Sequence, residues 1–219
     1  MADIILFGVG TTAQVMHYHL SRAGHRVAAF TVDRAFVAET NLLGCPVVPF
    51  EELDKHFPPD RYQMMVAIGY VKLNQLRAER CEQARALGYR LFSFISPTAA
   101  VWEGLEAGEH CRIGEQTLIQ PYTRLGTNVY VGSGCIVGHH SQLGDHCFLA
   151  SRVTLGGGVV VEPYAFLGTG AIIRNKVRIG ARSVVGAGAV ILEDTREGGV
   201  YVAAGAEELD ISSSELIPG

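Results

Sequence analysis

From residue 113 onward, hydrophobic side chains return at every sixth position of the chain. Ile, Leu or Val occupies all 14 of these positions between Ile113 and Ile191, and the residue four places further on is small each time. Glycine follows the aliphatic residue in nine of the 14 repeats. The frame is unbroken over this stretch, so no long loop is inserted into it.

A period of six residues predicts a parallel β-helix. Three repeats form one triangular coil, so residues i and i+18 stack on each other. The aliphatic residue and the small residue two places before it both point inward, and each coil buries its interior against the next. The small inward positions include Cys111, Cys135 and Cys147. We therefore expect these cysteines to be core residues rather than nucleophiles.

The first 95 residues show a different pattern, in which short apolar runs alternate with helical segments. Five strands are predicted, at residues 3–7, 26–32, 47–49, 64–68 and 90–95. Three helices are predicted, at residues 11–23, 51–57 and 71–87. This order implies a small parallel sheet with helices on its faces. The predicted domains are an α/β domain over residues 1–95, a β-helix over residues 96–206 and a tail over residues 207–219.

The composition limits the classes of protein that fit the chain. With 48% hydrophobic and 18% charged residues it is not a disordered chain, and a net charge of −4 argues against a general nucleic-acid binder. No apolar run reaches the roughly 18 residues of a membrane span. The acidic Asp3 stands where a signal peptide is basic. The five cysteines form no CxxC pair, so we expect reduced thiols and a cytoplasmic protein.

The segment Gly8-Val9-Gly10-Thr11-Thr12-Ala13 lies between a predicted strand and a predicted helix and fits the GxGxxA fingerprint of dinucleotide-binding domains. Asp33 follows at the end of the second strand. Because the domain has room for only one mononucleotide half, a nucleotide-linked sugar fits better than NAD, with its phosphates at the helix N-terminus and Asp33 on the base or ribose. Further candidates at the end of another strand are Gly69, Tyr70 and Asn74; for Tyr70, stacking on the ligand and packing at the edge are both open.

Two adjacent histidines, His139 and His140, occupy a predicted corner between faces of the β-helix, where side chains point outward. A histidine at such a place is either a general base, since its pKa lies near neutrality, or a solvated surface residue. Gly157 follows 18 residues after His139 and stacks on it one coil further on. A tight corner that needs a positive φ explains a glycine at this position, and such a corner is compatible with a further role for its backbone N–H.

No metal site is predicted from the spacing of possible ligands. Some trimeric β-helix proteins bind zinc through two histidines five residues apart, and this chain has no such pair. His110, Asn128 and His146 share one column of the β-helix, because each is 18 residues from the next. We interpret this column as a surface ladder.

These motifs together resemble the PglD/NeuD-like sugar acyltransferases of bacterial glycan synthesis, in which a small α/β domain precedes an uninterrupted left-handed β-helix. The resemblance covers the chain to about residue 206. It implies transfer of an acetyl group from acetyl-CoA to an amino group of a nucleotide-linked sugar, in the synthesis of lipopolysaccharide or another surface glycan. His139 matches the general base, and the N–H of Gly157 matches the donor to the thioester carbonyl. His140 replaces the acidic residue that usually follows the base, so it is assigned to the substrate, and Asp145 is the candidate that orients His139.

The resemblance also implies the remaining contacts. The protein is expected to form a homotrimer with its active site between subunits. The phosphates of coenzyme A are expected near Arg174 and Arg178. The edge of the pantetheine groove is expected at Gly168, Thr169, Gly170, Gly186, Ala187 and Gly188. The nucleotide-linked sugar is expected at Gly8, Gly10, Thr11, Thr12, Asp33, Gly69, Tyr70 and Asn74.

Two alternative functions stay open at the level of the sequence. One is O-acetylation of a sugar such as sialic acid, which depends more strongly on the base because a hydroxyl is harder to deprotonate. The other is a non-catalytic scaffold that binds a nucleotide. The second alternative is motivated by the missing acidic residue after His139 and by Glu207, which stands where the resembled family has a lysine.

Overall fold

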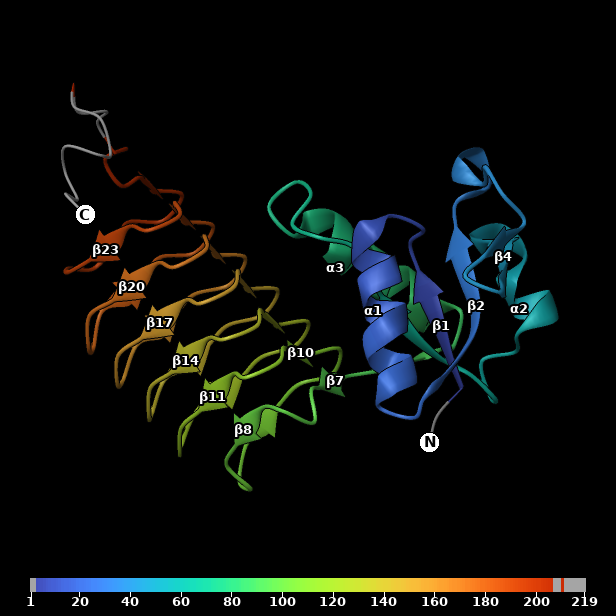
Figure 1. The fold of residues 1–219 in the computed structure, drawn as a ribbon, viewed down its shortest axis with the longest axis horizontal. Helices are drawn as coiled ribbons and strands as arrows, with labels where there is room; N and C mark the ends of the chain where they lie inside the picture. Colours follow the sequence, from blue (N-terminus) through green and yellow to red (C-terminus); the bar gives the residue numbers. More distant parts are fainter. Residues whose placement is uncertain (1–2, 207–209, 211–219) are drawn as a thin grey trace, which may run out of the picture.

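The computed structural model describes residues 3–206 and residue 210. An α/β domain lies against one side of a β-helix whose coils stack along the molecule (Figure 1). The predicted order of the two folds is confirmed. Within the described residues, no helix has the length and apolar composition that crossing a bilayer requires.

A six-stranded sheet in the order β3-β4-β2-β1-β5-β6 forms the centre of the N-terminal domain. Its strands are β1 (Asp3–Phe7), β2 (Arg26–Val32), β3 (Asn41–Leu42), β4 (Cys45–Pro49), β5 (Gln63–Val66) and β6 (Arg90–Leu91). The helices are α1 (Thr11–Arg22), α2 (Leu53–His56) and α3 (Gln75–Ala86). Helices α1 and α3 pack on opposite faces of β1. The strand order reverses between β1 and β5, so a ligand crevice is expected at their carboxyl ends.

Three parallel sheets form the faces of the β-helix. We call them the docked face, the apolar face and the polar face. The docked face contains β7 (Phe94–Ile95), β10 (Arg112–Ile113), β13 (Tyr130–Val131), β16 (Phe148–Leu149), β19 (Phe166–Leu167), β22 (Val184–Val185) and β24 (Val200–Tyr201). The apolar face contains β8 (Ala100–Val101), β11 (Leu118–Ile119), β14 (Ile136–Val137), β17 (Thr154–Leu155), β20 (Ile172–Ile173) and β23 (Val190–Ile191). The polar face contains β9 (Glu106–Ala107), β12 (Arg124–Leu125), β15 (Gln142–Leu143), β18 (Val160–Val161) and β21 (Arg178–Ile179).

The register confirms the stacking of residues i and i+18, for example Ile113 on Val131. The aliphatic residue of each repeat is buried, and so are the small inward residues. Among these, burial raises the pKa of the Cys135 thiol to about 11, which leaves it protonated and unreactive at neutral pH. The prediction that the inward cysteines are core residues is confirmed.

The corners of the β-helix repeat one backbone conformation. Every sixth residue from His110 to Gly188 has a positive φ, and most of these residues are not glycine. At the corner beside His139 the positive φ of 70° belongs to Gly158, so backbone conformation does not require glycine at position 157. The glycines that follow the aliphatic positions have another cause: a Cβ on Gly138 would lie 2.6 Å from the carbonyl carbon of Gly156 in the next coil.

The N-terminal domain packs on the docked face through a column of stacked side chains. The rings of Tyr130 and Phe148 stack with centroids 4.1 Å apart, and Tyr70 from the N-terminal domain packs on Phe148 and on Phe166. The strand expected over residues 90–95 is divided, because β6 belongs to the N-terminal sheet and β7 pairs with β10 of the β-helix. The two domains therefore meet between residues 91 and 94.

Candidate active site

His139 follows β14 at the corner between the apolar and polar faces, and its side chain is exposed. Its backbone N–H donates to Oε1 of Gln120 at 3.0 Å. Its Nδ1 lies 3.0 Å from Nδ1 of His140. One imidazole nitrogen of His139 thus has a fixed partner within the chain, which leaves Nε2 as the nitrogen that can accept a proton.

The ring of His139 lies directly against Gly157. A Cβ on Gly157 would lie 2.6 Å from both Cε1 and Nε2 of His139, closer than any side chain tolerates. The carbonyl oxygen of Gly157 accepts from the N–H of Lys176 at 2.9 Å, whereas the N–H of Gly157 has no acceptor among residues 3–206. The two residues that the 18-residue spacing pairs therefore form one site with a basic nitrogen and a free amide donor.

Asp145 does not belong to this site within one chain. It lies at the next corner, between the polar and docked faces, where its Oδ1 accepts from the N–H of Thr127 at 2.7 Å. Six residues along the β-helix advance the chain by one corner, which is why Asp145 and His139 point to different sides. The expectation that Asp145 orients His139 is corrected here: the contact is made by His140.

The residues expected to contact coenzyme A are divided between two corners. Arg174 follows β20 at the corner of His139, and it is exposed. Arg178 lies on the polar face, where its Nη1 pairs with Oε1 of Glu162 at 2.7 Å. The glycine-rich segments 168–170 and 186–188 stack on each other at the corner between the docked and apolar faces. Both corners border the apolar face, so one chain alone does not bring these segments to His139.

The carboxyl edge of the N-terminal sheet gathers most of the predicted nucleotide contacts. Gly8 has a φ of 121°, and a Cβ there would lie 3.0 Å from the carbonyl oxygen of Ala67 at the end of β5. Gly10 precedes α1, which begins with Thr11 and Thr12. Asp33 follows β2, but its Oδ2 pairs with Nη2 of Arg80 at 2.5 Å. Sequence patterns did not indicate this partner, because Arg80 is 47 residues away.

A crevice at this edge is lined by Val9, Gln14 and the segment after β2 that includes Glu39 and Leu42. This segment carries no motif, so it was not among the contacts predicted from the sequence. Two of the residues predicted to contact the nucleotide-linked sugar are engaged elsewhere and do not line this crevice. Asn74 is completely buried, and Tyr70, following Gly69, packs on the β-helix although it is more than half exposed.

The column of His110, Asn128 and His146 is a domain interface and not the surface ladder that we expected. His110 and Asn128 are 4% and 1% exposed. Nε2 of His110 accepts from the N–H of Val66 at 2.8 Å, so its Nδ1 carries the proton and donates to Oδ1 of Asn128 at 2.8 Å. Burial lowers the pKa of His110 to about 4, which keeps the ring neutral.

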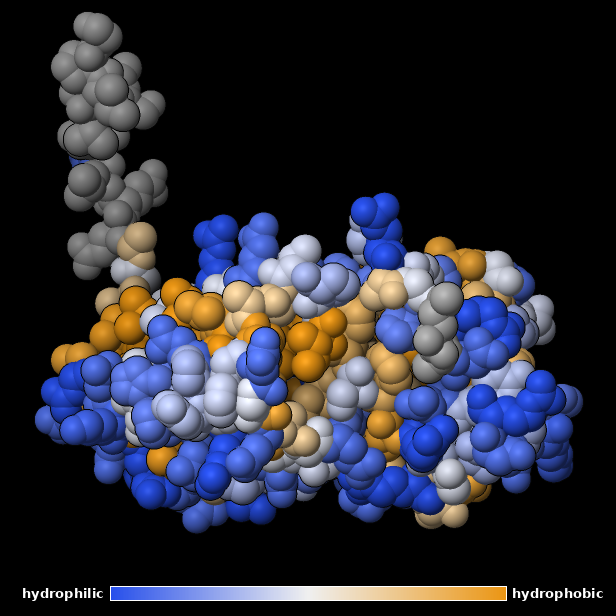
Figure 2. Space-filling view, turned by 90° about the horizontal axis from the view of Figure 1, so that it is seen from below, coloured by the Kyte–Doolittle hydropathy of each residue, from blue (hydrophilic) through white to orange (hydrophobic). Residues whose placement is uncertain are grey.

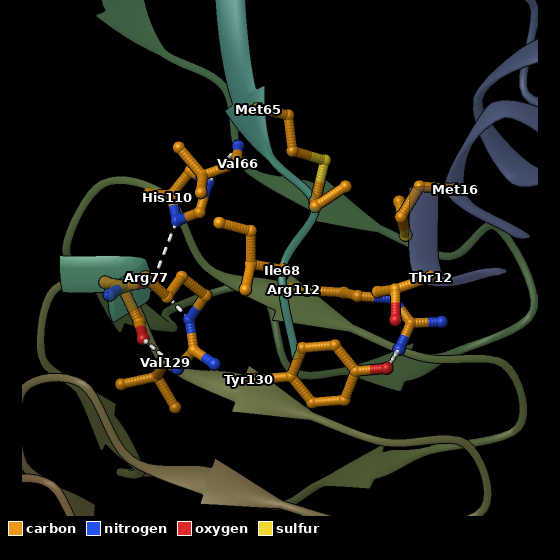
Figure 3. A pocket seen from close by; sticks show the side chains of 12 residues that line it. Thr12, Met16, Met65, Val66, Ile68, Arg77, His110, Arg112, Val129 and Tyr130 are labelled. Atoms are coloured by element: carbon orange, nitrogen blue, oxygen red, sulfur yellow. Dashed lines mark hydrogen bonds between the residues drawn. The ribbon is translucent and has the colours of Figure 1, made fainter. Parts of the chain in front are cut away.

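Arg77 completes this interface from α3. Its Nε donates to Oδ1 of Asn128 at 2.8 Å, and Nη2 donates to the carbonyl oxygens of Asn128 and Cys147 at 3.2 and 3.4 Å. Figure 3 shows the Arg77 and His110 side chains beside the small cavity between the domains. Its volume of about 10 Å³ holds one water at most, so this cavity is not a substrate site.

Possible metal ligands do not cluster in the part of the chain that the structure describes. Across residues 3–206 and residue 210, no three His, Cys, Asp or Glu side chains gather where they could hold a metal ion. The corner histidines instead form a pair with an amide donor, which suits acid–base chemistry.

A β-helix of six-residue repeats with a histidine at an exposed corner defines the class of hexapeptide-repeat acyltransferases. Residues 110–144 match the family model described as bacterial transferase hexapeptide (six repeats). No curated protein matches the chain in a sequence comparison.

Solved structures identify the family more narrowly. Perosamine N-acetyltransferase from Caulobacter crescentus, solved in complex with CoA and GDP-perosamine, is 30% identical over 93% of this chain and 94% of its own, with a TM-score of 0.84. The acetyltransferase domain of PglB from Neisseria gonorrhoeae FA1090 has the same fold, at 24% identity over 95% of this chain and 100% of that chain and a TM-score of 0.84. This chain belongs to the PglD/NeuD-like family of sugar acetyltransferases, and its β-helix is the left-handed one of that family.

Proposed function

We propose that this enzyme transfers the acetyl group of acetyl-CoA to the amino group of a nucleotide-linked amino sugar. The observation that carries the proposal is the pairing of His139 with Gly157, which places a basic nitrogen beside a free amide N–H. The likeness to the perosamine enzyme, whose structure holds CoA and GDP-perosamine, supports the class of both substrates. The resemblance supports a role in bacterial surface-glycan synthesis in the cytoplasm.

The chemistry follows from these two groups. The amine nitrogen attacks the carbonyl carbon of the thioester while Nε2 of His139 accepts the amine proton. Negative charge develops on the carbonyl oxygen, where the N–H of Gly157 donates a hydrogen bond. The C–S bond then breaks, the amide forms, and the departing thiolate takes up the proton that Nε2 of His139 accepted from the amine.

The arrangement of the domains supports a site shared between chains. Within one chain, the N-terminal domain covers the docked face and contacts its two corners through Glu115 and Asn128. His139 lies at the third corner, away from that domain. A sugar held by the N-terminal domain of one chain therefore reaches the base of another.

The apolar face supplies a surface for such an assembly. Its outward side chains include Leu118, Ile136, Ile172 and Val190, which are 37–56% exposed. An apolar band runs along the β-helix half of the molecule in Figure 2. Because a contiguous apolar surface of this kind marks an interaction site, we assign it to contacts between β-helices in a homotrimer. In that trimer the glycine-rich corner at 168–170 meets the His139 corner of a neighbour.

The proposed function is tested with acetyl-CoA and a panel of GDP-, UDP- and dTDP-linked amino sugars, each beside its hydroxyl analogue. We expect release of free thiol and a mass gain of one acetyl group on one amino sugar, and a trimer by sedimentation. Acetylation of the hydroxyl analogue alone, or of no sugar at all, contradicts the proposal.

Sharing of the site is tested by mixing two inactive variants. Gly10→Asp places a carboxylate where the phosphates are expected, and a Cβ at this position meets no atom within 4 Å. His139→Ala removes the base. Randomly mixed trimers are expected to recover about one quarter of the wild-type activity, since a site is intact when each of its two chains supplies the intact half. No recovery after confirmed subunit exchange contradicts a shared site.

Replacing Gly157 by alanine is expected to lower kcat by about tenfold to a hundredfold. The new methyl group would overlap the ring of His139 and displace it from the donor. Thermal unfolding is expected to change little, since φ at position 157 is not in the left-handed region. Gly205→Ala is the matched control, because a Cβ there meets nothing within 4 Å. A Gly157→Ala enzyme with wild-type kcat would show that the ring position does not matter.

A further inference from the structure

The residue after His139 is a second histidine, and its ring is turned toward the first. The two Nδ1 atoms lie 3.0 Å apart, the ring centroids 5.2 Å apart, and the ring planes are nearly perpendicular, at 89°. This geometry fits a hydrogen bond between two imidazoles, in which the N–H of one ring points at the nitrogen lone pair of the other. No carboxylate from the described residues takes part in it.

Only one proton lies between the two Nδ1 atoms. Whether Nε2 of His139 can accept a proton depends on which of the two rings carries it. If His140 donates, a neutral His139 carries its own proton on Nε2 and cannot accept another there. If His139 donates, its Nε2 has a free lone pair on the side of Gly157. We propose that His140 is the positioning residue of this enzyme, which accepts the hydrogen bond from Nδ1–H of His139 and so leaves Nε2 of His139 free to take the amine proton. This inference rests on the proposed function.

The backbone of His140 and one face of its ring have fixed contacts. Its backbone has a φ of 59°, as at each corner, and its N–H donates to the carbonyl oxygen of Pro121 at 3.0 Å. Its ring packs on Tyr122 with centroids 4.6 Å apart, and Tyr122 packs on Trp102 at 5.3 Å. This aromatic stack limits rotation of the imidazole and keeps Nδ1 directed at His139.

A neutral partner gives this enzyme a different response to acid from that of a base paired with a carboxylate. When His140 binds a proton, its Nδ1 no longer accepts, and the reactive tautomer of His139 is lost. Both rings must therefore be neutral before catalysis. The other charged or titratable groups at the same pocket are Tyr122 and the ion pair of Glu106 with Arg124, at 3.0 Å. Lys176 lies in the column of His140, two coils further on.

The test compares three variants at position 140. His140→Ala is expected to lower kcat by about tenfold to a hundredfold with KM unchanged, because the partner acts on the base and not on substrate binding. His140→Asn keeps an acceptor oxygen and tolerates a positive φ, so it is expected to recover most of kcat. In His140→Glu, the midpoint of the acidic limb of the kcat/KM–pH profile is expected to move to higher pH, because a carboxylate stabilises protonated His139. The slope of that limb is expected to fall from two protons toward one, because only one histidine must then be neutral.

Gln142→Ala is the matched control, since Gln142 lines the same pocket without contacting His139. An unchanged kcat in His140→Ala, or equal slopes and midpoints in wild type and His140→Glu, overturns the inference while leaving the proposed function intact. Full activity of His139→Ala, by contrast, overturns the proposed base itself. The Asn and Glu variants keep the test decisive if the alanine variant does not fold.

Discussion

Replacing His139 by alanine is expected to lower kcat by about a thousandfold, within the range measured for loss of a general base. The free amine must then lose its proton to water while it attacks the thioester. KM for both substrates is expected to stay within about twofold, because the proton is transferred only in the transition state. The fold is expected to persist, since the His139 side chain is exposed. Steady-state kinetics with the preferred amino sugar measures both parameters.

The matched control for this variant is His56→Ala, which removes another exposed histidine at the end of α2. It is expected to keep wild-type kcat. A His139→Ala enzyme whose kcat falls less than about threefold would mean that this corner does not carry the base.

Replacing Arg77 by alanine is expected to lower the free energy of unfolding by about 3 kcal/mol. Arg77 is 2% exposed, and its guanidinium joins α3 to two adjacent coils through Asn128 and Cys147. The variant removes one donor each from Oδ1 of Asn128 and the carbonyl oxygen of Cys147 and leaves the carbonyl oxygen of Asn128 without its donor. It also opens a cavity beside the ring of Phe148, which lies 5.5 Å from the guanidinium carbon. Burial lowers the pKa of Arg77 to about 10, so the side chain is still charged at neutral pH.

Urea unfolding measures this loss, and hydrogen exchange at the N–H of Val66 reports whether the domain interface opens. Arg77→Lys is expected to restore little stability, because an ammonium group cannot reproduce the several donors of the guanidinium. Arg22→Ala, at the exposed end of α1, is the control and is expected to change stability by less than about 0.5 kcal/mol. Equal unfolding midpoints for Arg77→Ala and wild type would mean that the interface network contributes no net stability.

Much of the candidate site could be predicted from the sequence, because in a β-helix the spacing of two residues along the chain predicts whether they lie next to each other. His139 and Gly157 are neighbours in space since residues i and i+18 stack, and counting alone paired them. Asp145 was expected near His139 although six residues advance the chain by one corner, and its proximity in sequence did not mean proximity around the triangular coil. The expected carboxylate contact was also misleading: the partner of His139 is the adjacent ring of His140, and its rotamer depends on Tyr122.

The sequence by itself determined the repeat and the column that pairs His139 with Gly157, because burial of one aliphatic residue in every six admits one stacking of the chain. Only the tertiary structure decided which face the N-terminal domain covers. That docking buries His110 and Asn128 and leaves His139 on the side away from the N-terminal domain, while packing within the N-terminal domain gives Asp33 its partner Arg80. These outcomes depend on contacts between residues far apart in the chain, and no local pattern of hydrophobic and polar residues encodes them.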